Sequence, residues 1–179
     1  MRNLIVELLD KSTELLGYFA GTVAIDQSDA TYTAATIGDT FAVGDTVVIS
    51  SAAQTASNGT FILRTVATGV ISVTIPPAIG IDDGADAIVI NQQVTGTFKE
   101  VSGFAALVGT INTSGNATIY IDQSANGVDT DYSSSWSVTG GTALSYSVEV
   151  ILPFAKMRIL NNGAAQTTMR AYMFGRKIS

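Results

Sequence analysis

Residues 117–124, which read ATIYIDQS, decide the fold class of this chain. The β-branched and aromatic residues in this stretch favour a β-strand. Its hydrophobic side chains alternate poorly with polar ones, which is typical of a strand covered on both faces. The stretch therefore predicts a central strand, and cover on both faces indicates that the chain oligomerises.

Similar runs surround this stretch and are separated by Gly and Asn turns. They predict further strands over residues 105–112, 133–138, 143–152, 156–160 and 167–177. Six strands in about 80 residues suit a β-sandwich or a jelly roll. We therefore predict a jelly-roll-like β-sandwich domain over residues 96–179.

The chain before this domain is also β-rich, which makes the predicted fold all-β. Strands are predicted over residues 46–50, 60–66, 70–75 and 87–91. Asn58-Gly59 and Thr68-Gly69 lie where tight turns are needed, because Gly and Asn tolerate positive φ. Residues 76–86, with two prolines and three aspartates, predict an exposed loop, and residues 92–96 a linker. This region predicts a small β-barrel domain, residues 20–95.

The N-terminus differs, because residues 4–16 have the spacing of an amphipathic helix. Gly17 is a suitable helix stop. A helix this short is marginal in water, so it must dock on its own domain, a sister subunit or a larger partner. We predict an N-terminal α-helical arm over residues 1–19, whose assembly contacts are Leu4, Ile5, Leu8 and Leu9.

The composition excludes several functions. The chain has no His and no Cys, which removes imidazole bases, thiol nucleophiles and the usual zinc sites. Only 13% of the residues are charged, so a surface covered by neighbouring molecules is favoured over a bare monomer. A stable β-domain with a Ser/Thr surface is the simpler alternative. The net charge of -6 argues against nucleic-acid binding, and no cofactor is predicted.

Membrane insertion and export are not predicted. The sequence contains no apolar run of membrane length. Glu7 and Asp10 interrupt the apolar N-terminus, which the core of a signal peptide would not carry.

Basic residues concentrate near the C-terminus, where they can meet an acidic partner. Five of the nine lie in the last 24 positions: Lys156, Arg158, Arg170, Arg176 and Lys177. A strand over residues 167–177 would place Arg170, Tyr172, Phe174 and Arg176 on one face. Aromatic residues and arginines dominate binding hot spots, so we predict an assembly interface that includes this face, Lys156 and Arg158. The alternative is that the arginine stems only cover the edge of the sandwich.

Clustered acidic residues leave two further interpretations. Asp122, Asp129 and Asp131, with Glu149, could supply a catalytic carboxylate pair, but a solvated turn explains them more simply. The oxygen ligands of residues 122–131, or of residues 82–86, could instead hold calcium, although neither spacing matches an EF-hand. Trp136 is either a core anchor or an exposed ring that stacks on a sugar. The sequence predicts no enzyme.

Two stretches resemble structural proteins of tailed-bacteriophage virions. Residues 41–49 (FAVGDTVVI), followed by residues 56–61 (ASNGTF) and a hairpin over residues 66–75, resemble a small β-barrel module of such proteins. Residues 117–124, the Asn126-Gly127 turn, Trp136, Gly140-Gly141 and residues 154–163 (FAKMRILNNG) resemble a phage jelly-roll domain that occurs in capsid decoration proteins.

This resemblance implies a capsid decoration, or cement, protein on the outer surface of an icosahedral phage head. Such a protein would be made in the host cytoplasm, form a homotrimer and bridge subunits of the major capsid protein. A tail, neck or baseplate subunit is the first alternative, because related β-modules occur throughout phage particles. A carbohydrate-binding or adhesin module is the third possibility, suggested by Trp136 and the tyrosines.

Overall fold

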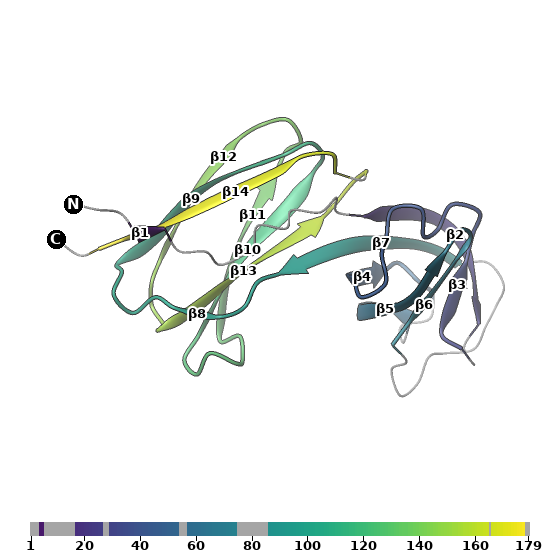
Figure 1. Cartoon of the computed structure of the whole chain (residues 1–179), viewed down its shortest axis with the longest axis horizontal. Helices are drawn as coiled ribbons and strands as arrows, with labels where there is room; N and C mark the ends of the chain where they lie inside the picture. Colours follow the sequence, from purple (N-terminus) through teal and green to yellow (C-terminus); the bar gives the residue numbers. More distant parts are fainter. Residues whose placement is uncertain are drawn as a thin grey trace. The chain divides into compact units, whose positions relative to one another are not determined.

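The computed structural model describes residues 4–5, 17–26, 29–53, 57–74, 86–164 and 166–177. These residues form strands and turns, which confirms the all-β prediction. They contain no helix long and apolar enough to cross a membrane. The chain divides into two compact units (Figure 1). Residues 16–94 with 163–165 form the barrel unit, and residues 1–15, 95–162 and 166–179 form the two-sheet unit.

The barrel unit is a closed β-barrel, as the sequence predicts. Neighbouring strands pair in the order β7-β2-β3-β6-β5-β4, and β4 also pairs with β7, which closes the ring. Closure leaves no unpaired sheet edge in the ring. The strands are β2 (Tyr18–Asp26), β3 (Thr31–Thr33), β4 (Thr46–Ser50), β5 (Gly59–Ala67), β6 (Val70–Val73) and β7 (Asp86–Thr95).

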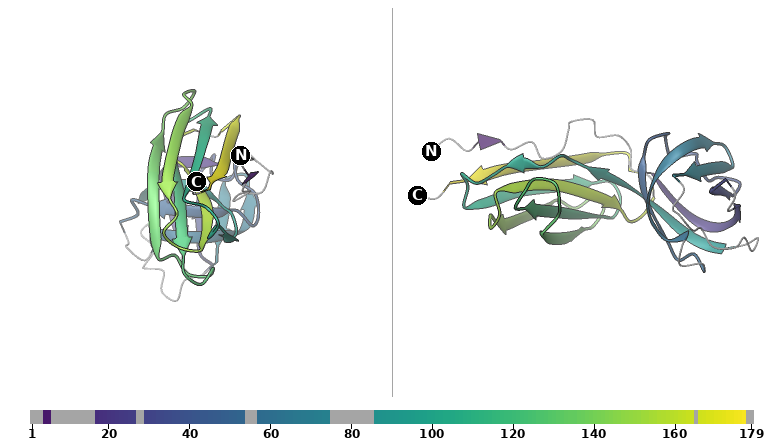
Figure 2. Two further views of the ribbon diagram at one scale, coloured as in Figure 1. Left: turned by 90° about the vertical axis from the view of Figure 1, so that its left-hand side faces the viewer. Right: turned by 90° about the horizontal axis from the view of Figure 1, so that it is seen from below.

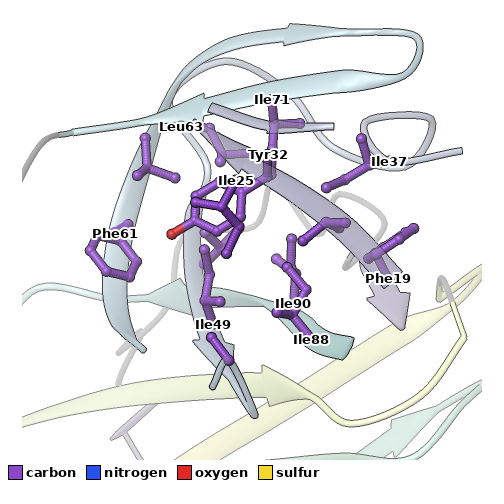
Figure 3. Close-up of a cluster of buried hydrophobic side chains, with 14 of the residues drawn as sticks. Phe19, Ile25, Tyr32, Ile37, Ile49, Phe61, Leu63, Ile71, Ile88 and Ile90 are labelled. Carbon is purple, nitrogen blue, oxygen red and sulfur yellow. The ribbon is translucent and has the colours of Figure 1, made fainter. Parts of the chain in front are cut away.

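A cluster of inward-facing side chains fills this barrel (Figure 3). Ile49, Leu63 and Ile90 point into it because alternate residues of each strand face the same side. Each such side chain contributes about 1.5–3 kcal/mol when fully buried. Tyr32 is also fully buried and its hydroxyl donates to the carbonyl of Ser57 at 3.4 Å. Burial raises the pKa of Tyr32, and the Ser57 hydrogen bond opposes that rise only in part.

The predicted linker over residues 92–96 is wrong, because β7 continues through Thr95. Gln92 pairs with Val47 of the neighbouring strand β4, and its side chain accepts a hydrogen bond from the Gly17 N–H. Asp86 is likewise part of β7, where it is buried and accepts from the Ala53 N–H at 3.1 Å. The rest of the predicted 76–86 loop lies outside the described residues.

The two-sheet unit holds the remaining strands in two antiparallel sheets that face each other (Figure 2). One sheet has the order β1-β14-β9-β12, and the other has the order β11-β10-β13-β8. The strands are β1 (Leu4–Ile5), β8 (Lys99–Glu100), β9 (Ala106–Thr113), β10 (Ala117–Ser124), β11 (Tyr132–Val138), β12 (Leu144–Glu149), β13 (Phe154–Asn161) and β14 (Met169–Arg176).

Along each strand of this unit, side chains alternate between the core and the outer face. On β13, Met157 and Ile159 are buried while Lys156 and Arg158 lie on the outer face. The core side chains are Leu107, Ile111, Ile119, Ile121, Tyr146, Met157, Ile159, Met169 and Met173. The ring centroids of Trp136 and Tyr146 are 5.4 Å apart, so Trp136 contacts the second sheet as a core anchor would.

The predicted N-terminal helix is wrong where the structure describes it. Leu4 and Ile5 form β1, which pairs with Gly175 and Phe174 of β14. The backbone groups of Leu4 and Ile5 pair with a strand about 170 residues away in the sequence, whereas a helix would pair them with residues four positions along the chain. The remainder of the predicted helix, including Leu8 and Leu9, lies outside the described residues.

Candidate assembly surfaces

A charged cluster lies on the outer face of the β11-β10-β13-β8 sheet. Arg158 on β13 donates to the carboxylate of Asp122 on β10, from Nε to Oδ2 at 2.5 Å and from Nη2 to Oδ1 at 3.0 Å. The Lys156 ammonium lies 4.0 Å from Asp122 Oδ2, and the Ser133 hydroxyl donates to Oδ1 at 2.7 Å. Strand register explains the cluster, because Asp122 lies opposite both Lys156 and Ser133.

Two aromatic rings complete this cluster. The guanidinium of Arg158 lies 4.4 Å from the ring centroid of Tyr120, and the ammonium of Lys156 lies 4.4 Å from that of Phe98. Cations over aromatic faces are attracted by the ring quadrupole. Covered in this way, Asp122 is fully buried although it lies on an outward-facing strand position. This cover explains why β10 reads as a strand buried on both faces.

The electrostatics of the cluster favour the charged carboxylate. Burial alone raises the pKa of Asp122, but hydrogen bonds from Arg158 and Ser133 and the charges of Arg158 and Lys156 together outweigh burial and lower the pKa below its ordinary value. The same hydrogen bond raises the pKa of Arg158. Lys156 and Arg158 therefore neutralise a charge of their own chain, which weakens their predicted role as contacts for an acidic partner.

The outer face of β14 is different, because its side chains are more exposed. Arg170 and Arg176 are exposed, Tyr172 is 58% exposed and Phe174 is half-buried, whereas Met169 and Met173 are buried behind them. This outer row, Arg170, Tyr172, Phe174 and Arg176, is called the β14 face below. Across the sheet it lies beside Ala106, Val108, Thr110 and Asn112 of β9, which in turn lie beside Ser145, Ser147 and Glu149 of β12.

Two glycines allow the β14 face to be held in place. A Cβ on Gly109 would lie 2.2 Å from the carbonyl oxygen of Tyr172. The Tyr146 hydroxyl donates to that same oxygen at 3.2 Å. A Cβ on Gly175 would lie 2.3 Å from the ring of Phe104. The backbone beneath Tyr172 and Phe174 is therefore fixed by packing that admits no side chain at either glycine.

The predicted interface residues do not form one surface. Lys156 and Arg158 lie on the outer face of one sheet, and the β14 face belongs to the other sheet. Leu4 and Ile5 pair with β14, so the structure brings their backbone to the edge of the β14 face. Sequence reasoning missed Tyr120, Phe98 and Ser133 as partners of the basic residues. One sequence signal could have indicated a charged partner for the basic residues: Asp122 is the one charged residue within the strand-forming run 117–124.

The acidic residues after Asp122 serve the β10–β11 turn. Asn126 Oδ1 accepts from the N–H groups of Val128 and Asp129 at 2.9 and 3.0 Å. Asp129 accepts from the Asn126 amide at 2.9 Å, and Asp131 accepts from the Ala125 N–H at 2.8 Å. Within the described part of the chain, no group of three or more His, Cys, Asp or Glu side chains could hold a metal ion. These contacts are those of a turn stabilised by Asp and Asn side chains.

Comparison with known proteins adds one similarity. Residues 88–174, from β7 to β14, match the family described as "Uncharacterised protein YqxG N-terminal domain". None of the curated proteins compared with the chain matches it. The matched region contains both the Asp122 cluster and most of the β14 face, but it carries no assigned activity.

Proposed function

We propose that this chain is a non-enzymatic structural protein of a phage virion, most specifically a capsid decoration protein that bridges subunits of the major capsid protein on the outer surface of the head. Support comes from the sequence resemblance, from the sparse charge and from the exposed β14 face. Of the acidic residues considered for catalysis, Asp122 is held in the Arg158 contact, and Asp129 and Asp131 are held in the β10–β11 turn.

We infer that the two-sheet unit is a jelly roll. Its described strands form two four-stranded antiparallel sheets, and the chain passes from one sheet to the other between β8 and β9, β9 and β10, β11 and β12, β12 and β13, and β13 and β14. The first strand, β1, pairs with the last, β14. Eight strands in two sheets connected in this way are the pattern of two interleaved Greek keys. The barrel unit is inserted between the first two of these strands.

The observation that carries the proposal is the β14 face. It places two arginines around an exposed tyrosine and a half-buried phenylalanine on one strand, next to the shorter side chains of β9. This composition is that of a binding hot spot rather than of an average surface. Each Å² of apolar surface that a capsid covers contributes roughly 25 cal/mol before ordering costs. Weak contacts repeated over many copies add up on one particle.

The test is binding to phage heads that lack this chain. We expect saturation at a fixed number of copies per head and greater resistance of the saturated heads to heating. The double substitution Arg170→Ser with Tyr172→Ser should weaken binding at least tenfold. Ile62→Ser, which removes an apolar side chain that is 49% exposed on the barrel unit, is the matched control and should bind normally. Absence of saturable binding by the unmodified chain would refute the proposal.

A tail, neck or baseplate position is the alternative within the virion. A sixfold ring of the purified protein, with binding to tails rather than heads, would favour it. The carbohydrate-binding alternative relied on Trp136, which is half-buried and packs against Tyr146. Glycan-induced protection of Trp fluorescence would be needed to favour that function.

A further inference from the structure

The two-sheet unit ends on one side in two unprotected strand edges. Among the described residues, β11 is the last strand of one sheet and β12 is the last strand of the other. The two strands contact each other and lie along the same side of the unit (Figure 2, left). An edge strand presents unpaired N–H and C=O groups, which favour pairing with another strand.

β11 lacks the usual protection of such an edge. The sequence from Tyr132 to Val148 contains all of β11 and β12 up to its last residue, Glu149, and it has no charged residue and no proline. β11 pairs with β10 over seven residues in continuous register, and β12 pairs with β9 over six, so neither pairing is interrupted by a bulge. Charges, prolines and bulges are the devices that keep exposed edges apart. A seven-residue edge without them indicates that it is covered in the assembled protein.

We propose that β11 pairs antiparallel with β11 of a second copy of this chain, about a twofold axis at Ser135. Ser135 is the middle residue of β11, so this register uses the full strand. It places Ser133 opposite Ser137 of the partner subunit and Tyr132 opposite Val138 of the partner subunit. The two four-stranded sheets that contain β11 join into one continuous sheet.

The side chains of β11 are self-complementary in this register. On the outer face, the serines at positions 133, 135 and 137 meet only serines, and hydroxyl pairs across strands are favourable. On the inner face, small Ser134 lies opposite the large ring of Trp136 of the partner subunit. Trp136 is held by Tyr146, so the ring does not have to be ordered on association.

Charge also favours a second copy at this edge. The chain carries a net charge of -6, so two copies repel one another at most orientations. The uncharged stretch from Tyr132 to Val148 is where two copies can meet without placing like charges together. A twofold contact of this kind is isologous and closes at two copies. It differs from the threefold symmetry that the phage resemblance implies.

The test uses the full chain and the absence of native cysteine. Light scattering should give the mass of a dimer at micromolar concentration. Ser135→Cys should form a disulfide-linked dimer on mild oxidation, because the two substituted side chains meet at the axis. Thr60→Cys, an exposed strand position on the barrel unit, is the matched control and should remain mostly uncrosslinked.

Ser135→Lys gives a second readout. It places two ammonium groups opposite each other, so the dimer dissociation constant should rise at least tenfold, while Thr60→Lys should leave it unchanged. Circular dichroism and the melting temperature of each variant check folding. A monomer at high concentration, or an oligomer that neither substitution at Ser135 affects, would overturn the β11 pairing.

This inference goes beyond the proposed virion function and can fail separately from it. A chain that saturates phage heads yet shows no β11 dimer would refute only the pairing. A chain that forms the β11 dimer and ignores heads and tails would refute only the virion role.

Discussion

Arg158 contacts Asp122 with both a side-chain Nε and an Nη2, so the two residues form a bidentate ion pair across β13 and β10. The two partners differ in burial. The side chain of Asp122 is 1% exposed, whereas that of Arg158 is 25% exposed. Removing the arginine therefore leaves a buried charge, while removing the carboxylate leaves a cation that can reach water.

This difference predicts an asymmetry between two substitutions. Arg158→Met should lower the free energy of unfolding by about 3 kcal/mol, because the buried carboxylate keeps only the more distant Lys156 as a cation. Asp122→Asn should lower it by about 1–2 kcal/mol. Urea unfolding of both variants measures the difference. Combining Arg158→Met with Asp122→Leu should recover part of the loss, and equal losses for the two single variants would contradict the account.

The lowered pKa of Asp122 predicts a dependence of stability on acid. The folded carboxyl binds a proton less readily than the unfolded one, whose ordinary pKa is 3.8. The unfolded chain therefore takes up more protons as the pH falls past this value, and stability decreases. The contribution of Asp122 is complete above the ordinary pKa and is lost as the pH falls through the lowered one. The stability difference between the unmodified chain and Asp122→Asn should be constant above about pH 5 and should shrink as the pH falls below it. A difference that does not shrink would exclude this cause.

Gln123 is predicted to hold the β12–β13 connection. Its fully buried amide donates to the carbonyl of Glu149 at 2.7 Å and accepts from the N–H groups of Ile151 and Leu152 at 2.9 and 3.1 Å. Gln123→Leu should cost about 2–3 kcal/mol, since these backbone groups lose their partner. Hydrogen exchange by NMR should accelerate at the two amides more than at Leu63 of the barrel unit. Equal acceleration at all three would point to global destabilisation alone.

The glycines beneath the β14 face predict a graded response to alanine. Gly109→Ala should be the most damaging, because the new methyl group meets the backbone oxygen of Tyr172, which cannot rotate away. Gly175→Ala meets the ring of Phe104, so Phe104→Leu should partly rescue it. Gly103→Ala is the control, because its Cβ has no neighbouring atom within 4 Å. The melting temperatures of the three glycine variants rank their losses of stability. A lowered melting temperature for Gly103→Ala would argue against steric causes.

Local sequence signals predict the strands well where the signal is itself local. Residues 46–50 are predicted with the bounds that β4 has, and the Asn126-Gly127 turn is present, with Gly127 at φ 74°. Signals fail where distant residues decide the structure. β2 contains Gly21 and an irregular hydrophobic pattern, and it becomes a strand by pairing with β3 and β7. The spacing of residues 4–16 indicates a helix, yet β14 recruits Leu4 and Ile5 into a sheet.

In the candidate sites, too, local patterns predict some features and distant pairing decides the others. Alternation along residues 167–177 predicts the outward residues of the β14 face, as the burial of Met169 and Met173 confirms. No local pattern could predict that Asp122 separates from Asp129 and joins Arg158. That pairing depends on the register between β10 and β13, which is fixed by tertiary packing.

The insertion of the barrel unit within the two-sheet unit sets an order for folding during translation. The strands of the barrel are all synthesised by residue 95, so this ring can close while the ribosome is still making the rest of the chain. β1 leaves the ribosome before the barrel, but its partner β14 is made only at residues 169–176. The two-sheet unit therefore completes its β1–β14 pairing only at the end of synthesis. Chains interrupted before Met169 would carry a finished barrel and leave β9 without β14, an exposed strand edge that favours aggregation.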